Sequence, residues 1–169
     1  VIEKGIIDLL EALHKIDDDF IFIHIGDLDK EKRGYKKLIN RLDELKNDKM
    51  HFYGFQTDVE MYLSCMDIFC FPSHREGFPV SVMEAAVLGL PIISTDIRGC
   101  REAIVDGFSG ILIKPYNSEE ITKALKILIK NKSIREYYSR NAQEYAIKYF
   151  DRNIMIKTYM ELYNSYYCN

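Results

Sequence analysis

Two glutamates, Glu76 and Glu84, are the first candidates for chemistry in this chain, with seven residues, 77–83, between them. An ionised carboxylate only accepts hydrogen bonds, so it can bind the hydroxyl groups of a sugar or a ribose. An alternative interpretation is that both glutamates are favourable charges near a helix start, with no role in binding. The residues around them favour the first interpretation.

A strand, a loop and a helix follow one another around these glutamates. The apolar run 66–71 predicts a buried strand, 72–79 carries turn residues, and 80–88 has apolar residues at helical spacing. Gly89 and Pro91 are expected to end the helix. A loop that leads into a helix N-terminus directs free N–H groups and the positive end of the helix dipole at one point. The sequence therefore predicts an anion site, suited to a phosphate, at the helix start.

The run E-G-F-P-V-S-V-M-E-A at 76–85, followed by G-L-P-I-I-S-T-D at 89–96, resembles the E-x7-E signature of family 4 retaining glycosyltransferases. These are nucleotide-sugar-dependent enzymes of the GT-B fold. The resemblance extends over most of the chain, in the family's order. Its other landmarks are E-K-G at 3–5, I-G-D at 25–27, F-Y-G-F at 52–55, R-G-C-R-E at 98–102 and V-D-G-F-S-G-I-L-I-K-P at 105–115.

The resemblance implies a role for each matching residue. Lys4 and the helix start would hold the donor diphosphate, Glu84 the ribose hydroxyls, and Glu76 the donor sugar, which it would orient for same-face attack. Taken without the resemblance, Lys4 is a solvated lysine at a helix start. The implied site consists of the catalytic residue Glu76 and the donor-binding residues Lys4, Gly26, Phe55, Gly77, Phe78, Pro79, Val80, Ser81 and Glu84.

No metal or other cofactor is expected, because the helix start and Lys4 would stabilise the leaving diphosphate in place of a divalent ion. The resemblance also places the loop after residue 95 near the donor sugar, which makes Arg98, Gly99 and Arg101 secondary candidates. Either arginine could equally form a surface ion pair, with Glu102 or Asp106.

At 169 residues, with 47% hydrophobic and 29% charged residues, the chain has the size and composition of one globular domain. The net charge of −3 argues against a nucleic-acid partner. No apolar run approaches the ~18 residues of a membrane span, and no signal peptide is visible. We therefore expect a cytoplasmic protein, peripheral at the inner face of the membrane if it meets a membrane at all, through another domain.

Strands and helices alternate to about residue 130, which predicts an α/β fold with a doubly wound, Rossmann-like parallel sheet of about five strands and helices on both faces. Thr57 and Ser118 are expected to cap helices. Most of the eight tyrosines after Glu136 are expected to pack on the body, and some to meet a further domain. Strands are predicted at 20–25, 51–54, 66–71, 91–95 and 110–113, and helices at 6–13, 30–45, 57–65, 80–88, 100–105, 118–130, 133–149 and 153–167.

In family 4 enzymes a strand and a phosphate-contacting arginine precede E-K-G, and the acceptor half of the protein precedes both. Residues 1–169 are therefore expected to be a single nucleotide-sugar-binding domain, inactive without that partner domain. The implied reaction transfers a hexosyl or N-acetylhexosaminyl group from a nucleoside diphosphate sugar, in bacterial polysaccharide or glycolipid synthesis. R-G-C-R-E at 98–102 resembles bacterial cell-surface polysaccharide transferases that use UDP-sugars, and this resemblance implies a UDP-sugar donor. Two alternatives remain open, a nucleotide-sugar epimerase of the same fold and a non-catalytic nucleotide-binding module.

Overall fold

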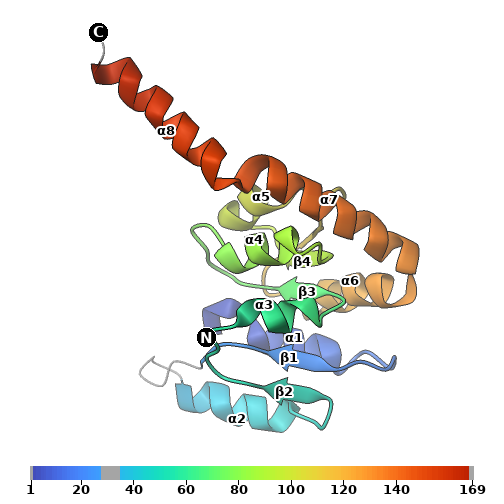
Figure 1. The fold of residues 1–169 in the computed structure, drawn as a ribbon. Helices are drawn as coiled ribbons and strands as arrows, with labels where there is room; N and C mark the ends of the chain where they lie inside the picture. The colour runs from blue at the N-terminus through green and yellow to red at the C-terminus, as the bar shows by residue number, and fades with distance from the viewer. Residues whose placement is uncertain (1, 28–34, 168–169) are drawn as a thin grey trace.

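The structure is a computed structural model that describes residues 2–27 and 35–167, and it alternates strands with helices as the sequence predicts. Figure 1 shows the arrangement of the elements. They are η1 (Ile2–Lys4), α1 (Ile6–Leu13), β1 (Phe22–His24), α2 (Tyr35–Leu45), β2 (Met50–Phe52), α3 (Val59–Ser64), β3 (Phe69–Phe71), α4 (Val80–Val87), β4 (Ile92–Thr95), α5 (Arg98–Ala103), β5 (Ile111–Ile113), α6 (Ser118–Lys130), α7 (Lys132–Phe150) and α8 (Arg152–Tyr167).

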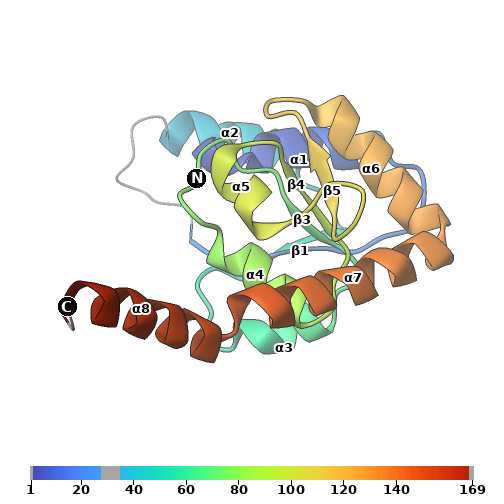
Figure 2. The same ribbon diagram turned by 90° about the horizontal axis from the view of Figure 1, so that it is seen from above.

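Helices cover both faces of the strands, and this confirms the predicted fold class. In Figure 2 the helices α1, α2 and α6 lie on one side of the strands, and α3, α4 and α7 lie on the other. Helix α1 packs against α2 and α6, while α4 packs against α7. β4 is buried on both faces, because Ile93 joins the core under α1 and α6 and Ile92 joins the core under α4 and α7.

The strands do not form the one continuous sheet that the sequence suggested. All pairings are parallel, but they make two sheets, one with β1 and β2 and one with the order β3-β4-β5. Among residues 2–27 and 35–167, strands β1 and β3 therefore each pair on one edge only. The two edges face a common cavity, which is described below.

Several element ends differ from the prediction by a few residues. Asn117, rather than Ser118, caps α6, because its side-chain oxygen accepts a hydrogen bond from the N–H of Glu120 at 3.0 Å. Asp58, rather than Thr57, is the residue before α3. Helix α2 begins at Tyr35, and the part predicted at 30–34 lies outside the described residues. The predicted end of α4 is confirmed, since Gly89 follows it with φ 71° and Leu90 N–H donates back to Ala85 O.

Helix α8 projects away from the body of the molecule (Figures 1 and 2) and buries none of its residues. The expectation that most of the eight late tyrosines pack on the body is wrong, because six of them are exposed: Tyr137 and Tyr149 on α7, and Tyr159, Tyr163, Tyr166 and Tyr167 on α8. Tyr138 and Tyr145 on α7 are half-buried, as expected. Within the described part of the chain, no helix is long and apolar enough to cross a membrane.

Candidate functional site

The predicted strand, loop and helix around the two glutamates are present. Strand β3 ends at Phe71, and α4 begins at Val80 directly after Pro79. No side chain caps this helix start, and the Pro79 carbonyl already accepts from the N–H groups of Val82 and Met83. The N–H groups of Val80 and Ser81 precede the first complete turn and have no acceptor inside the helix. They can therefore serve an anion.

Lys4 lies against the loop that carries Glu76, and the two side chains form an ion pair. The Glu76 side chain is only 11% exposed, whereas that of Lys4 is 50% exposed. The Lys4 ammonium also lies 5.5 Å from the centre of the Phe71 ring, a cation–π arrangement. One positive and one negative group thus meet where β3 ends.

Backbone contacts from η1 hold Lys4 in this position. The carbonyl of Glu3 accepts hydrogen bonds from the N–H of His74 at 2.7 Å and from the Ser73 hydroxyl at 3.1 Å. Ser73 is fully buried, so its hydroxyl has a fixed place in the core. The next residue, Gly5, has φ 69°, and a Cβ there would stand 2.0 Å from the Pro72 carbonyl oxygen. The positions of Lys4 and Glu76 are therefore coupled through the chain.

A second set of contacts ties the same loop to α1 and to the turn after β5. His74 Nε2 lies 2.6 Å from an Asp8 carboxylate oxygen. The ring of Tyr116 lies against the His74 ring, with ring centres 3.7 Å apart and the planes tilted by 36°. Tyr116 has φ 60°, the one positive value at a non-glycine residue in the described ranges. Asp8 and Tyr116 thus hold the loop that carries His74. The sequence did not predict a role for either residue, because both are distant from His74 along the chain.

The backbone at Glu76 and Gly77 rests on the start of α5. A Cβ at Gly99 would stand 2.2 Å from the Gly77 carbonyl oxygen, so only glycine fits there. Arg98 pairs with Glu102, as the alternative interpretation suggested, and Arg101 pairs with Asp96. Both arginines are thus engaged at the surface in ion pairs.

The opposite wall comes from the ends of β1 and β2. Gly26 N–H donates to Gly54 O at 2.8 Å, and the N–H of Phe55 donates to Asp27 Oδ1 at 3.1 Å. These bonds fix the two loops against each other, and Phe55 is 70% exposed. An exposed aromatic ring beside a cavity can stack on a flat ligand group.

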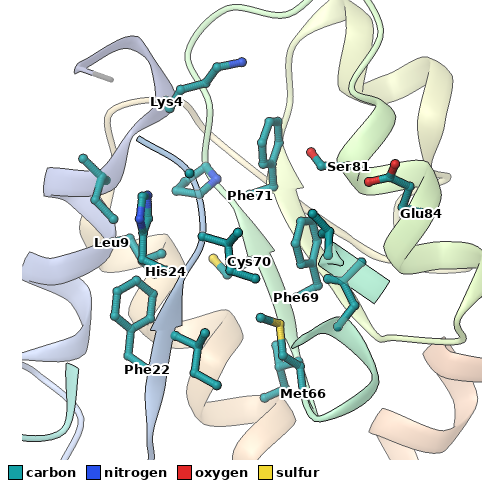
Figure 3. A pocket seen from close by; sticks show the side chains of 18 of the residues that line it. Lys4, Leu9, Phe22, His24, Met66, Phe69, Cys70, Phe71, Ser81 and Glu84 are labelled. Carbon is teal, nitrogen blue, oxygen red and sulfur yellow. The ribbon is translucent and has the colours of Figure 1, made fainter. Parts of the chain in front are cut away.

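These parts surround one cavity of about 1240 Å³. Nine of the ten predicted site residues line it, and Gly77 does not. Figure 3 shows Lys4 at one end of the cavity, Ser81 and Glu84 on α4, and side chains of β1 and β3 along its length. The nine residues are Lys4, Gly26, Phe55, Glu76, Phe78, Pro79, Val80, Ser81 and Glu84.

Along β1 and β3 the cavity is lined mainly by apolar side chains, and burial favours the neutral form of two titratable groups there. Burial lowers the pKa of His24 below its ordinary value. Burial also raises the pKa of the Cys70 thiol to about 12. Lys4 and Glu84 lie apart from His24 and Cys70 (Figure 3), and Glu76, the partner of Lys4, also lines the cavity. Across residues 2–27 and 35–167, no group of three His, Cys, Asp or Glu side chains could hold a metal ion.

Comparison with known proteins identifies relatives over nearly the whole chain. The family of glycosyl transferases group 1 matches residues 1–145. The N,N'-diacetylbacillosaminyl-diphospho-undecaprenol alpha-1,3-N-acetylgalactosaminyltransferase of Campylobacter jejuni is 31% identical over 161 residues, which are 95% of this chain and 41% of that protein. The capsular polysaccharide biosynthesis glycosyltransferase CapM of Staphylococcus aureus is 26% identical, over 94% of this chain and 50% of the relative. The chain thus spans about half the length of these relatives, or less.

Solved structures share the fold. HepE of Anabaena, in a crystal structure with UDP, superposes with a TM-score of 0.90 at 25% identity, covering 98% of this chain and 46% of HepE. The C-terminal domain of LpcC, a glycosyl transferase group 1 family protein of Francisella tularensis, superposes with a TM-score of 0.77 at 25% identity, covering 90% of this chain and 82% of that domain. The family match over most of the chain and these shared folds lead to one conclusion: the chain belongs to the glycosyl transferases group 1 family.

Proposed function

We propose that this chain is the donor-binding domain of a glycosyltransferase that transfers a sugar, with retention, from a nucleoside diphosphate sugar to a hydroxyl acceptor. The proposed donor is a UDP-sugar carrying a hexosyl or N-acetylhexosaminyl group, and the product is a bacterial polysaccharide or glycolipid. One observation carries the proposal: Lys4, Glu76, the start of α4 and Glu84 line one cavity in a chain of this family. HepE, a neighbour of the same fold, binds UDP in its crystal structure.

The charged residues that line the cavity, Lys4, Glu76 and Glu84, suit the parts of such a donor. The N–H groups at Val80 and Ser81 and the Lys4 ammonium would bind the diphosphate and stabilise it as it leaves. Glu84 would accept hydrogen bonds from ribose hydroxyls, and Glu76 from sugar hydroxyls. We do not assign Glu76 as a covalent nucleophile.

The acceptor side of the reaction would come from a further domain of a longer protein. This follows from the proposal that residues 1–169 form a single donor-binding domain, and from the length of relatives of which this chain spans about half. Residues 1–169 alone should then bind nucleotide weakly and transfer no sugar. Sugar transfer by these residues alone would contradict the two-domain proposal.

Thermal shift measurements test the choice of ligand. UDP and UDP-sugars should raise the unfolding midpoint of residues 1–169 more than GDP, ADP or their sugars do, because specific binding stabilises the native state by mass action. The shift should be the same with EDTA as with Mg²⁺ or Mn²⁺. A shift that EDTA abolishes would show that a metal binds the diphosphate, and the absence of any shift at millimolar nucleotide would contradict donor binding.

A further inference from the structure

His74 contacts the chain on both sides of Lys4, the residue proposed to bind the diphosphate. Its backbone N–H donates at 2.7 Å to the carbonyl of Glu3, which precedes Lys4. Its ring lies beside Gly5, which follows Lys4, because a Cβ at Gly5 would stand 3.3 Å from His74 Nε2. His74 therefore limits how far the backbone of Lys4 can move in either direction.

The ring of His74 is itself fixed by α1. His74 Nε2 lies 2.6 Å from a carboxylate oxygen of Asp8, and because an ionised carboxylate only accepts hydrogen bonds, Nε2 carries the hydrogen of this bond. The two side chains are 8% and 21% exposed, so water competes little for the bond. Asp8 stands in the first turn of α1, directly after Gly5, Ile6 and Ile7. The His74 ring is thus attached to the helix that Lys4 leads into.

Tyr116, from the turn between β5 and α6, adds a third element to this group. Its ring lies against the His74 ring, with ring centres 3.7 Å apart. Tyr116 has φ 60°, a value that a residue with a Cβ rarely adopts. Such conformations persist where surrounding contacts over-determine them, and they gather at functional sites. Tyr116 is 73% exposed, so burial of its own ring offsets little of this cost, and the contact with His74 is what the conformation provides.

Asp8, His74 and Tyr116 act from outside the cavity. None of the three is among the residues that line it, whereas Lys4 and Glu76 both line it. Glu76 follows His74 by two residues, and its carboxylate pairs with the Lys4 ammonium. A lysine side chain is long and flexible, so the reach of its ammonium depends on where its backbone is held. A backbone that is already fixed lowers the ordering cost when a ligand binds.

We propose that His74 is a positioning residue for the diphosphate site: bound to Asp8 and covered by Tyr116, it sets the place from which the Lys4 ammonium reaches the donor. The inference rests on the proposed function, since it requires that Lys4 binds a diphosphate. It assigns His74 no contact with the donor and no proton transfer. Without the His74 ring, the Lys4 ammonium samples more positions, and its ordering opposes binding.

Calorimetric titration of the longer natural protein with UDP tests the proposal. His74→Ala should weaken UDP binding about fivefold, because a hydrogen bond to a charged group is worth about tenfold in affinity or more, and misplacement of the ammonium loses part of it. His74→Gln keeps an N–H that can donate to Asp8, so it should restore most of the affinity. His51→Ala removes an exposed histidine from β2, and as the control it should leave the affinity unchanged.

A double-mutant cycle with Lys4 separates positioning from general support of the fold. Lys4→Met should itself weaken UDP binding at least about tenfold. In the Lys4→Met background, His74→Ala should cause no further loss, because His74 acts through the ammonium that is now absent. Asp8→Ala should repeat the effect of His74→Ala, and the two together should cost no more than either alone. Alanine favours a helix, so α1 persists in Asp8→Ala and the test remains decisive if His74→Ala does not fold.

Three outcomes would overturn the proposal while the proposed function stands. His74→Ala could bind UDP as tightly as the parent does. Its loss could persist in the Lys4→Met background, which would make His74 a general support of the fold. Asp8→Ala could leave the affinity unchanged, which would remove the partner that fixes the ring. A parent protein that does not bind UDP, or that binds it equally well as Lys4→Met, would instead refute the proposed role of Lys4, and this inference with it.

Discussion

At the scale of residues, the site depends on contacts between distant parts of the chain. Lys4 and Glu76 are 72 positions apart and form an ion pair. Asp8 and His74 are 66 positions apart and support the same loop. The resemblance indicated Lys4 and Glu76 one by one, but it gave no sign that they pair. Tertiary contacts between distant segments hold each charged side chain in position, and substitution of each residue measures what it contributes to binding.

The two glutamates should differ in what they bind. Glu84→Gln keeps the shape and one acceptor oxygen and loses only the charge, so it should forfeit part of the roughly 1.5–3 kcal/mol of a charged hydrogen bond and weaken binding of free UDP several-fold to about tenfold. Glu76→Gln should leave the affinity for free UDP nearly unchanged and should lower the transfer rate of the longer protein, since sugar orientation matters most in the transition state. Calorimetric titration and steady-state rates measure the two effects. Equal losses of UDP affinity in both variants would refute the division of roles.

His24 should make the domain less stable in mild acid. Burial lowers its pKa below 6.5, so the folded chain keeps the ring neutral while the unfolded chain takes up a proton. Its contribution to stability is present above pH 6.5 and is lost as pH falls from there through the lowered pKa. The free energy of unfolding should therefore drop less between pH 7 and pH 5 in His24→Gln than in the parent. Identical drops in urea titrations of the two proteins would contradict this account.

At the scale of elements, η1 and the loop after β3 behave as one unit. Gly5 joins η1 to α1 with φ 69°, and its Cα faces the Pro72 carbonyl. The hydrogen bonds to Glu3 O continue the contact on the other side of Lys4. Anything that separates this pair of segments moves Lys4 away from Glu76.

Substitution of Gly5 measures this close approach. Gly5→Ala combines a positive φ with a clash against Pro72, so it should destabilise the domain by about 3 kcal/mol, of which about 1 is backbone strain and about 2 is overpacking. Gly107→Ala is the matched control, because Gly107 has φ 71° and a Cβ there meets nothing within 4 Å. It should cost only about 1 kcal/mol. Similar losses for both variants in denaturant unfolding would mean that Pro72 moves aside.

The elements themselves were largely predictable, because each depends on local pattern. All five strands were predicted, since short apolar runs between turn residues mark buried strands. The cap at Asn117 was displaced by one residue, as either polar side chain could serve. The division into two sheets was not predictable, because strand pairing depends on which strand lies next to β1 in space. The support of His74 by Asp8 and Tyr116 was missed for the same reason.

At the scale of the whole molecule, α8 stands apart from the body. Its exposed apolar side chains include Met155, Met160 and Leu162, in addition to the tyrosines. A helix that is apolar on several sides usually lies against another surface, and tyrosine suits interfaces that are partly wet. We propose that α8 contacts the acceptor domain of the longer protein, and that the body folds without it.

Truncation tests the independence of the body. Residues 1–151 should retain the free energy of unfolding of residues 1–169 to within about 0.5 kcal/mol, because α8 buries no residue of its own. Residues 1–131 are the control and should lose cooperative unfolding, since α7 packs against α4 and buries Ala142 and Ala146 in the core. Denaturant unfolding monitored by circular dichroism measures both. If residues 1–151 lose more than about 2 kcal/mol of the free energy of unfolding, α8 packs on the body in solution, which would contradict the proposal that it contacts another domain.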